Sequence, residues 1–205
     1  MVLSRALGLA ITSGSILLFI PQILKIFNAK SAKGISLFSQ ILALLGAAST
    51  AAYSFSKGFV FSQWGDSFFV GIQLMIVVMQ ILYYSDASAY AFAFFAFCWA
   101  FTFAIIGSYI PIEVLITVQA LGIPITFVSK SIQAWQNYKY QSTGQLSLVS
   151  VFLQFAGTVA RVFTSIQDTG DLLLIVSFGT ASFLNAIIFA QFFIYWDEKK
   201  RKKMH

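Results

Sequence analysis

One sequence pattern occurs twice in this chain at a constant spacing. The first copy joins Pro21 and Gln22 to a short basic stretch at residues 31–37, and in the second copy Gln133 precedes a similar stretch at residues 142–148. The distance along the chain from Gln22 to Gln133 is called the repeat spacing below, and it also relates Ser31 to Ser142, Ser36 to Ser147 and Leu37 to Leu148. A repeat at a fixed spacing predicts a fold that uses one structural unit twice.

A second pair of matching segments follows the two copies of this pattern. A Gly-Asp pair at residues 65–66 precedes an apolar run that contains Gln80, and a Gly-Asp pair at residues 170–171 precedes a run that contains Asn185 at the same distance. This match predicts that Gln80 and Asn185 occupy equivalent places in the two units.

The composition indicates a membrane protein. Hydrophobic residues make up 59% of the chain, charged residues only 10%, and the mean hydropathy is +0.82. A soluble domain carries about 25% charged residues, so this little charge cannot cover a water-facing surface. The apolar runs approach the roughly 20 residues of a transmembrane helix, rather than the roughly ten alternating residues of a barrel strand.

A chain of this length holds about seven such spans with short loops. The apolar start, residues 1–26, leads directly into the first copy of the repeat and is therefore expected to be structure rather than a cleaved leader. The expected spans are residues 3–27, 35–56, 67–84, 87–107, 112–136, 146–166 and 172–196.

The sequence therefore predicts an all-α polytopic membrane protein made of two three-helix bundles joined by a linker helix. The expected parts are a first repeat at residues 1–86, a linker helix at 87–110, a second repeat at 111–198 and a basic tail at 199–205. The linker is rich in Phe and Ala and has no polar stripe, so we expect it to face lipid.

The basic residues indicate how the chain is oriented. Counting by alternate loops places ten Lys and Arg residues on the side of the tail and three, Arg5, Lys57 and Arg161, on the other side. The positive-inside rule then predicts a cytoplasmic C-terminus and a lumenal or external N-terminus. Both bundles begin on the same side, so the repeats are expected to be parallel.

The tail carries Lys202 and Lys203 at the fourth and third positions from its end. This is the dilysine pattern that retrieval coats recognise on proteins of the endoplasmic reticulum (ER). A basic flank that stops transfer through the membrane explains the charge equally well, and both interpretations stay open from the tail alone.

Polar side chains within the expected spans fall on common helix faces, and such side chains are costly in lipid. They suit either a shared cavity that binds a polar substrate or hydrogen bonds between packed helices. Their occurrence on five helices favours the cavity. The candidate substrate-binding amides are Gln22, Gln73, Gln80, Gln119, Gln133, Gln154 and Asn185.

Pro21 and Pro124 lie within expected spans, where each removes a main-chain donor. Each predicts either a fixed bend or a hinge at which half of a repeat moves.

Arg161 lies inside the sixth expected span, where a guanidinium needs a partner. Glu113, Asp168 and Asp171 are expected on the same side of the membrane as candidate partners. The alternatives are a structural ion pair and a clamp for a phosphate group, which suits the geometry of arginine.

Catalytic and metal-binding signatures are missing from the sequence. His205 is its only histidine, the acidic residues are scattered, and there is no nucleophile elbow or P-loop. We therefore expect neither enzyme activity nor a cofactor or metal. The segregation of the basic residues by membrane side also argues against a nucleic-acid partner.

The Pro21-Gln22 motif, with two parallel three-helix bundles and a linker helix, resembles the PQ-loop family. That family includes the SWEET sugar transporters, the lysosomal amino-acid exporters and, more distantly, the KDEL receptors. Within it the chain is similar to the mannose-phosphate-dolichol utilisation defect proteins. The stretches that carry this resemblance are residues 29–37, 143–148, 160–171 and 193–196.

The resemblance implies an ER membrane protein needed for lumenal use of dolichol-phosphate-mannose and dolichol-phosphate-glucose in glycosylation and GPI-anchor synthesis. It implies a dolichol-phosphate-linked sugar as ligand and favours ER retrieval by Lys202 and Lys203. Two features depart from the family pattern: the second motif reads Ile132-Gln133, and the N-terminus is short.

Two other functions stay open at the level of sequence. One is a SWEET-like or cystine-exporter-like carrier of a small sugar or amino acid, although the chain places no acidic residue near the middle of a span for proton coupling. The other is a non-transporting partner that organises lumenal glycosyltransferases.

Overall fold

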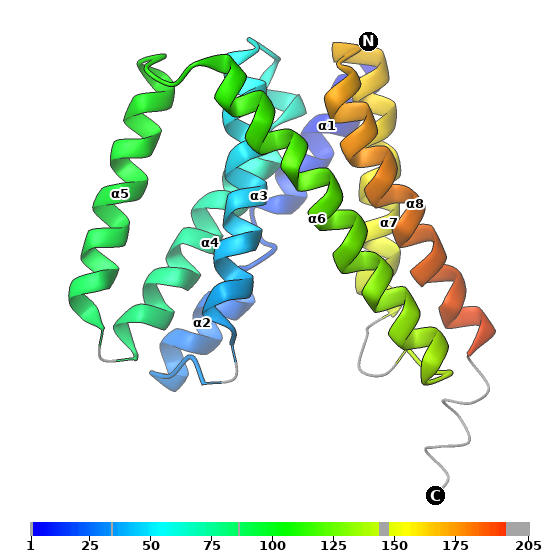
Figure 1. Ribbon diagram of the computed structural model, residues 1–205, viewed down its shortest axis with the longest axis horizontal. Coiled ribbons are helices and arrows are strands. Elements are labelled where there is room, and N and C mark those ends of the chain that lie inside the picture. The colour runs from blue at the N-terminus through cyan, green and yellow to red at the C-terminus, as the bar shows by residue number, and fades with distance from the viewer. Residues whose placement is uncertain (1, 34, 86, 144–147, 196–205) are drawn as a thin grey trace, which may run out of the picture. The chain divides into compact units, whose positions relative to one another are not determined.

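The computed structural model describes residues 2–33, 35–85, 87–143 and 148–195, and all regular structure within these ranges is helical (Figure 1). A short 3₁₀ helix, Phe61–Gln63, precedes α4, and a π-helical segment, Ser165–Thr169, continues α7. The α-helices are α1 (Val2–Ser15), α2 (Ile20–Ala29), α3 (Leu37–Ser56), α4 (Gly65–Tyr83), α5 (Ser88–Ile106), α6 (Ile112–Lys139), α7 (Leu148–Thr164) and α8 (Leu172–Ile194).

Six helical segments of the described residues are long and apolar enough to cross a membrane. The first of them, Leu3–Ala29, contains both α1 and α2. The 17-residue α7 is shorter and runs directly into the π-helical segment. The predicted all-α polytopic membrane fold is thus confirmed.

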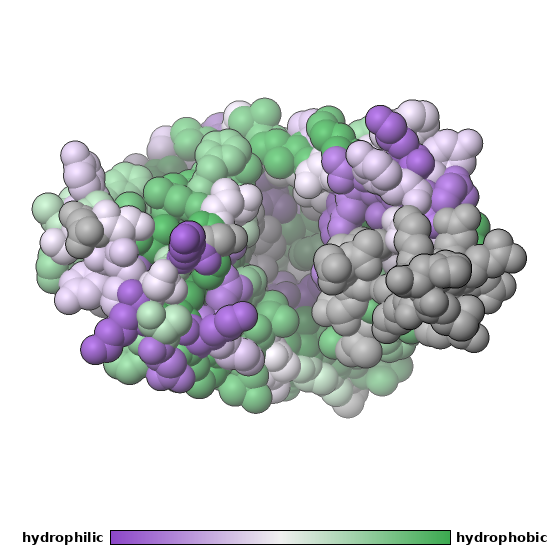
Figure 2. Space-filling model, turned by 90° about the horizontal axis from the view of Figure 1, so that it is seen from below, coloured by the Kyte–Doolittle hydropathy of each residue, from purple (hydrophilic) through white to green (hydrophobic). Residues whose placement is uncertain are grey.

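The surface agrees with a membrane location. On α5 the aromatic side chains Phe92, Phe97 and Phe103 are each about two-thirds exposed, as a lipid-facing linker requires. Figure 2 shows separate patches of hydrophilic residues at one end of the helices, with hydrophobic residues beside them.

Contacts divide the chain into two compact units, which are described separately. The first unit contains residues 5–119, and the second contains residues 1–4 and 120–205. In the first unit α4 packs against α2, α3 and α5. In the second unit α7 packs along α8.

The helix boundaries confirm the duplication, because they recur at the repeat spacing. α3 begins at Leu37 and α7 at Leu148, and α4 ends at Tyr83 and α8 at Ile194. The chain turns through a left-handed residue at Lys30 after α2 and at Gln141 after α6, with φ angles of 46° and 47°. The same local geometry therefore occurs at equivalent places in both copies.

Each unit also has its own buried apolar cluster, and the two clusters lie at equivalent positions of the repeats. Val77 and Ile81 of α4 pack with Ile26 in the first unit. Their counterparts on α8 at the repeat spacing, Ile188 and Phe192, pack with Val151 in the second unit.

The first expected span is not a single bent helix. Main-chain turns at residues 16–19 separate α1 from α2, and Pro21 lies in the first turn of α2. A proline ring clashes with the carbonyl four residues earlier, here that of Leu17, and provides no N–H to bond with it. The chain therefore leaves the helix at residues 16–19, in the turn that precedes Pro21, where the sequence predicts a kink.

The second copy does not repeat this break. α6 is continuous from Ile112 to Lys139, with Ile132 at the place of Pro21. Pro124 also lies inside α6 without interrupting it.

Gly8 and Gly14 offer a matched test of how α1 packs. A Cβ atom on Gly8 would lie 2.6 Å from the main-chain oxygen of Ser62, whereas a Cβ atom on Gly14 would meet nothing within 4 Å. We expect Gly8→Ala to lower the free energy of unfolding by about 1–3 kcal/mol. Gly14→Ala should be neutral or stabilising by up to about 1 kcal/mol. Thermal unfolding in detergent measures both, and equal effects would contradict this packing.

Candidate functional site

Gln73 of α4 connects the two sides of the break between α1 and α2. The main-chain N–H of Phe19 donates to Gln73 Oε1 at 2.7 Å, and Gln73 Nε2 donates to the carbonyl of Ser15 at 2.9 Å. The side chain is only 5% exposed. One amide thus bonds a main-chain donor and a main-chain acceptor that a continuous helix would have bonded to itself.

Gln80, two turns further along α4, binds the helix after the break. Its Nε2 donates to the carbonyl of Ile23 at 3.2 Å. Its Oε1 is buried and has no hydrogen-bond partner among the described residues. Gln80 therefore bonds α2 through its amide nitrogen alone.

The second unit contains an equivalent but more complete arrangement. Gln191 Nε2 donates to the carbonyl of Ala134 at 2.8 Å, and Gln191 Oε1 accepts from Asn137 Nδ2 at 2.8 Å. The repeat spacing relates Gln191 to Gln80 and Ala134 to Ile23. The same carbonyl is therefore bound by the same glutamine in both repeats.

This geometry corrects one prediction. The spacing from the Gly-Asp pairs matched Gln80 with Asn185, but Gln191 makes the contact that corresponds to that of Gln80. Asn185 instead donates weakly to α7, to the carbonyl of Gln154 at 3.4 Å and to Thr158 Oγ1 at 3.5 Å.

Asn137 and Gln191 were not among the predicted site residues, although the repeat spacing applied to Gln80 leads directly to Gln191. At the place of Asn137 the first repeat has Ile26, which is buried in the apolar cluster. Because isoleucine has no polar hydrogen in its side chain, it leaves Gln80 Oε1 without the partner that Gln191 has.

The remaining predicted amides fall into two groups. Gln119 is buried and accepts from Ser49 Oγ at 3.1 Å and Thr50 Oγ1 at 3.2 Å, and Gln154 Oε1 accepts from Lys130 Nζ at 2.8 Å. These contacts join neighbouring helices. Gln22 and Gln133, the matched pair of the repeat motif, are half-buried, and their side chains make no hydrogen bond within the described residues. The convergence of all these amides on one cavity stays a prediction.

Arg161 alone is buried among the charged side chains that the structure describes, with 3% exposure. Thr164 and Ser165, one turn further on, are also buried, and the π-helical segment starts at Ser165. π-Helical turns occur often at functional sites. The end of α7 is therefore a polar region inside the second unit.

The three predicted acidic partners of Arg161 occupy different places. Asp168 accepts from Ser4 Oγ at 2.6 Å, and Asp171 caps α8 by accepting from the main-chain N–H of Leu174 at 3.1 Å. Glu113 is exposed in the first turn of α6, in the first unit. The assignment of Glu113, Asp168 or Asp171 as the charge partner stays a prediction.

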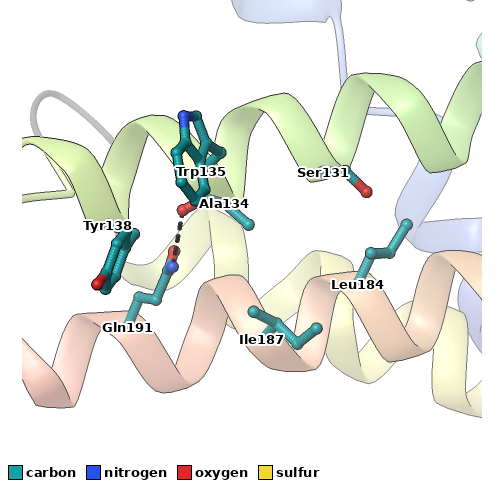
Figure 3. Close-up of a pocket in the computed structure, with 7 residues that line it drawn as sticks. All are labelled: Ser131, Ala134, Trp135, Tyr138, Leu184, Ile187 and Gln191. Atoms are coloured by element: carbon teal, nitrogen blue, oxygen red, sulfur yellow. Dashed lines mark hydrogen bonds between the residues drawn. The ribbon is translucent and has the colours of Figure 1, made fainter.

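A groove of about 410 Å³ lies between α6 and α8 (Figure 3). Figure 3 shows the amide of Gln191 directed at Ala134, with Trp135 and Tyr138 beside it. The lining contains no charged side chain and suits an apolar group better than a charged one. The groove residues are Ser131, Ala134, Trp135, Tyr138, Leu184, Ile187 and Gln191.

Side chains that could bind a metal ion do not cluster in the part of the chain that the structure describes. No group of three or more His, Cys, Asp and Glu side chains within it could hold a metal ion.

The family model of the PQ loop repeat matches residues 3–63 and 114–174, which together make up more than half of the chain. The chain belongs to the PQ-loop family. The two matched segments are related by the repeat spacing, which also relates the two glutamine contacts to main-chain carbonyls.

A solved structure has a similar fold. It is described as a eukaryotic SWEET transporter determined at 3.7 Å resolution, and the two structures superpose with a TM-score of 0.71. The match covers 95% of this chain and 99% of the other, at 12% sequence identity. This PQ-loop protein therefore has the fold of two three-helix repeats joined by a linker helix.

The carbonyl contact gives a test that compares the two repeats. We expect Gln191→Leu to destabilise the protein by about 1–2 kcal/mol, because it removes two short hydrogen bonds and leaves the buried Asn137 amide unsatisfied. Gln80→Leu should cost less than about 0.5 kcal/mol, because it removes one longer bond together with an unsatisfied oxygen. Thermal unfolding in detergent compares them, and a larger loss for Gln80→Leu would contradict the assignment.

Proposed function

We propose that this PQ-loop protein binds a polyisoprenyl-phosphate sugar and translocates it across the membrane or presents it to lumenal enzymes. The observation that carries the proposal is the burial of Arg161 near the end of α7, within the sixth span expected from the sequence. A guanidinium is costly to place within a bilayer, and such residues usually serve a substrate path or a bound anion. Its planar set of donors suits a phosphate group.

The sugar would be bound by amides that are not engaged elsewhere. Gln22 and Gln133 are half-buried and have both donors and acceptors available within the described residues. The amides of Gln73, Gln80, Gln119, Gln154 and Asn185 bond to neighbouring helices and would support these two. Pro21 is the proposed hinge, and Pro124, which lies inside the uninterrupted α6, is the proposed fixed bend.

The resemblance at residues 160–171, which include Arg161, supports dolichol-phosphate-mannose and dolichol-phosphate-glucose as the ligands. The protein would then serve N-glycosylation and GPI-anchor synthesis in the ER. We propose a lumenal N-terminus and a cytoplasmic C-terminus from the distribution of Lys and Arg residues.

A second function is favoured by the SWEET-like fold alone. A carrier of a small soluble sugar would use the same half-buried amides, but it would have no need for the buried guanidinium. Uptake of free sugar into vesicles therefore separates the two functions.

The phosphate role of Arg161 can be tested in vesicles that contain the purified protein and labelled dolichol-phosphate-mannose. Wild-type protein should move the lipid between leaflets faster than empty vesicles do. Arg161→Ala should reduce that rate by at least about tenfold, and Arg161→Lys should restore it only in part, because lysine lacks the bidentate geometry.

Arg5→Ala is the matched control, because Arg5 is exposed and expected on the same membrane side. Normal movement in well-folded Arg161→Ala protein would remove the phosphate assignment. Rapid uptake of free glucose or mannose with no movement of the lipid would favour the soluble-sugar carrier.

The proposed retrieval signal lies outside the described residues and is tested in cells. We expect replacement of Lys202 and Lys203 by serine to move the protein from the ER to later compartments. Replacing Lys199 and Lys200 by serine removes the same charge and should leave it in the ER. An unchanged distribution of the first variant in fluorescence microscopy would exclude the retrieval role.

A further inference from the structure

The two repeats differ at the place where the first helix is broken. Pro21 and Gln73 of the first repeat correspond, at the repeat spacing, to Ile132 and Leu184 of the second. The first repeat, which has Pro21 and Gln73, is broken at residues 16–19. At the equivalent residues of the second repeat, 127–130, α6 is continuous. Both the residue that causes the break and the residue that bonds across it are thus absent from the second repeat.

The break exposes main-chain groups in a part of the chain that spans the membrane. Unsatisfied N–H and C=O groups cost several kcal/mol each in the hydrocarbon region. Ile16 N–H and Leu18 N–H form local turns with the carbonyls of Ser13 and Ser15. The N–H of Phe19, next to α2, is bonded by Gln73 Oε1.

The surroundings of Gln73 hold its amide in one orientation. Its Nε2 donates both to Ser15 across the break and to the carbonyl of Phe69, four residues earlier on α4, at 3.0 Å. Because Nε2 is committed to two carbonyls, Oε1 faces Phe19. The amide therefore bonds the end of α1 and the start of α2 at the same time.

We propose that Gln73 is a positioning residue that fixes the arrangement of α1 and α2 about the break, so that the first repeat is the adjustable half of the protein and the second repeat is rigid. Release of the Gln73 amide allows α2 to turn about residues 16–19. In the second repeat Ile132 permits a continuous helix, and the side chain of Leu184 has no polar atom with which to hold a break. The consequence for transport rests on the proposed function, whereas the role of Gln73 at the break does not.

The direct test measures hydrogen exchange of the main-chain amides at residues 16–20 in protein reconstituted in lipid nanodiscs. Gln73→Leu, which introduces the residue found at position 184, should speed this exchange by about tenfold, the effect expected from losing a buried hydrogen bond. Gln191→Leu is the matched control, because it also removes a glutamine bond to the main chain but in the other repeat. Unchanged exchange in Gln73→Leu, or an equal increase in Gln191→Leu, would overturn the proposal.

A double variant keeps the test decisive if Gln73→Leu does not fold. Pro21→Ile combined with Gln73→Leu gives the first repeat the residues of the second, so residues 16–20 should become helical and exchange more slowly than in the wild-type protein. A folded double variant with slow exchange supports the proposal. A double variant that also fails to fold, or that exchanges as fast as Gln73→Leu, overturns it.

Movement of dolichol-phosphate-mannose in vesicles separates positioning from a merely structural role. If Gln73 served only stability, the double variant would regain both its unfolding temperature and its activity. We expect it to regain stability and to lose at least about tenfold in the rate of lipid movement, because the first repeat can no longer adjust. Full activity in the stable double variant contradicts the adjustable first repeat. If the wild-type protein moves no lipid, the proposed function fails, and the exchange measurements still decide the role of Gln73.

Discussion

Hydrogen bonds from glutamine side chains to the main chain hold the helices of each repeat together. A chain within lipid cannot bond its stray main-chain groups to water, so any departure from a regular helix needs a side chain from a neighbouring helix. α4 provides Gln73 for the break between α1 and α2. Gln80 of α4 and Gln191 of α8 instead bond carbonyls inside α2 and α6 and so join neighbouring helices. These bonds explain why polar residues are retained in spans that are otherwise apolar.

The duplication and the class of fold follow from the sequence, because both depend on patterns that lie along the chain. Apolar runs of helical length determine the spans, and a constant spacing between matched residues determines the repeat. The match of Gln80 with Asn185 was wrong for a physical reason. α8 has 23 residues and α4 has 19, and their ends, rather than their beginnings, keep the repeat spacing. Counting from the Gly-Asp pair before each helix therefore gives the wrong partner.

The break before Pro21 could not be predicted from the sequence around it. A proline within a span permits a bend or a full interruption, and the outcome depends on whether a distant side chain can bond the freed groups. Gln73 is distant from the break along the chain, and only the packing of α4 against α2 brings it to Phe19 and Ser15. The Asn137–Gln191 bond was missed for a similar reason, since it joins two helices that are distant in sequence.

The two repeats of this PQ-loop protein thus share a fold but differ in how firmly it is fixed. In the second repeat Asn137 satisfies the Gln191 amide and α6 continues unbroken, and the buried Arg161 lies in this half. In the first repeat the chain is interrupted, and the oxygen of Gln80 is left without a partner among the described residues. Solid-state NMR of the protein in lipid bilayers, with Leu17, Leu18, Val128 and Ser129 labelled, tests this asymmetry most directly. We expect larger helical carbon shifts for Val128 and Ser129, which lie in the continuous α6, than for Leu17 and Leu18, which lie in the turns between α1 and α2; equally helical shifts at all four positions would contradict the asymmetry.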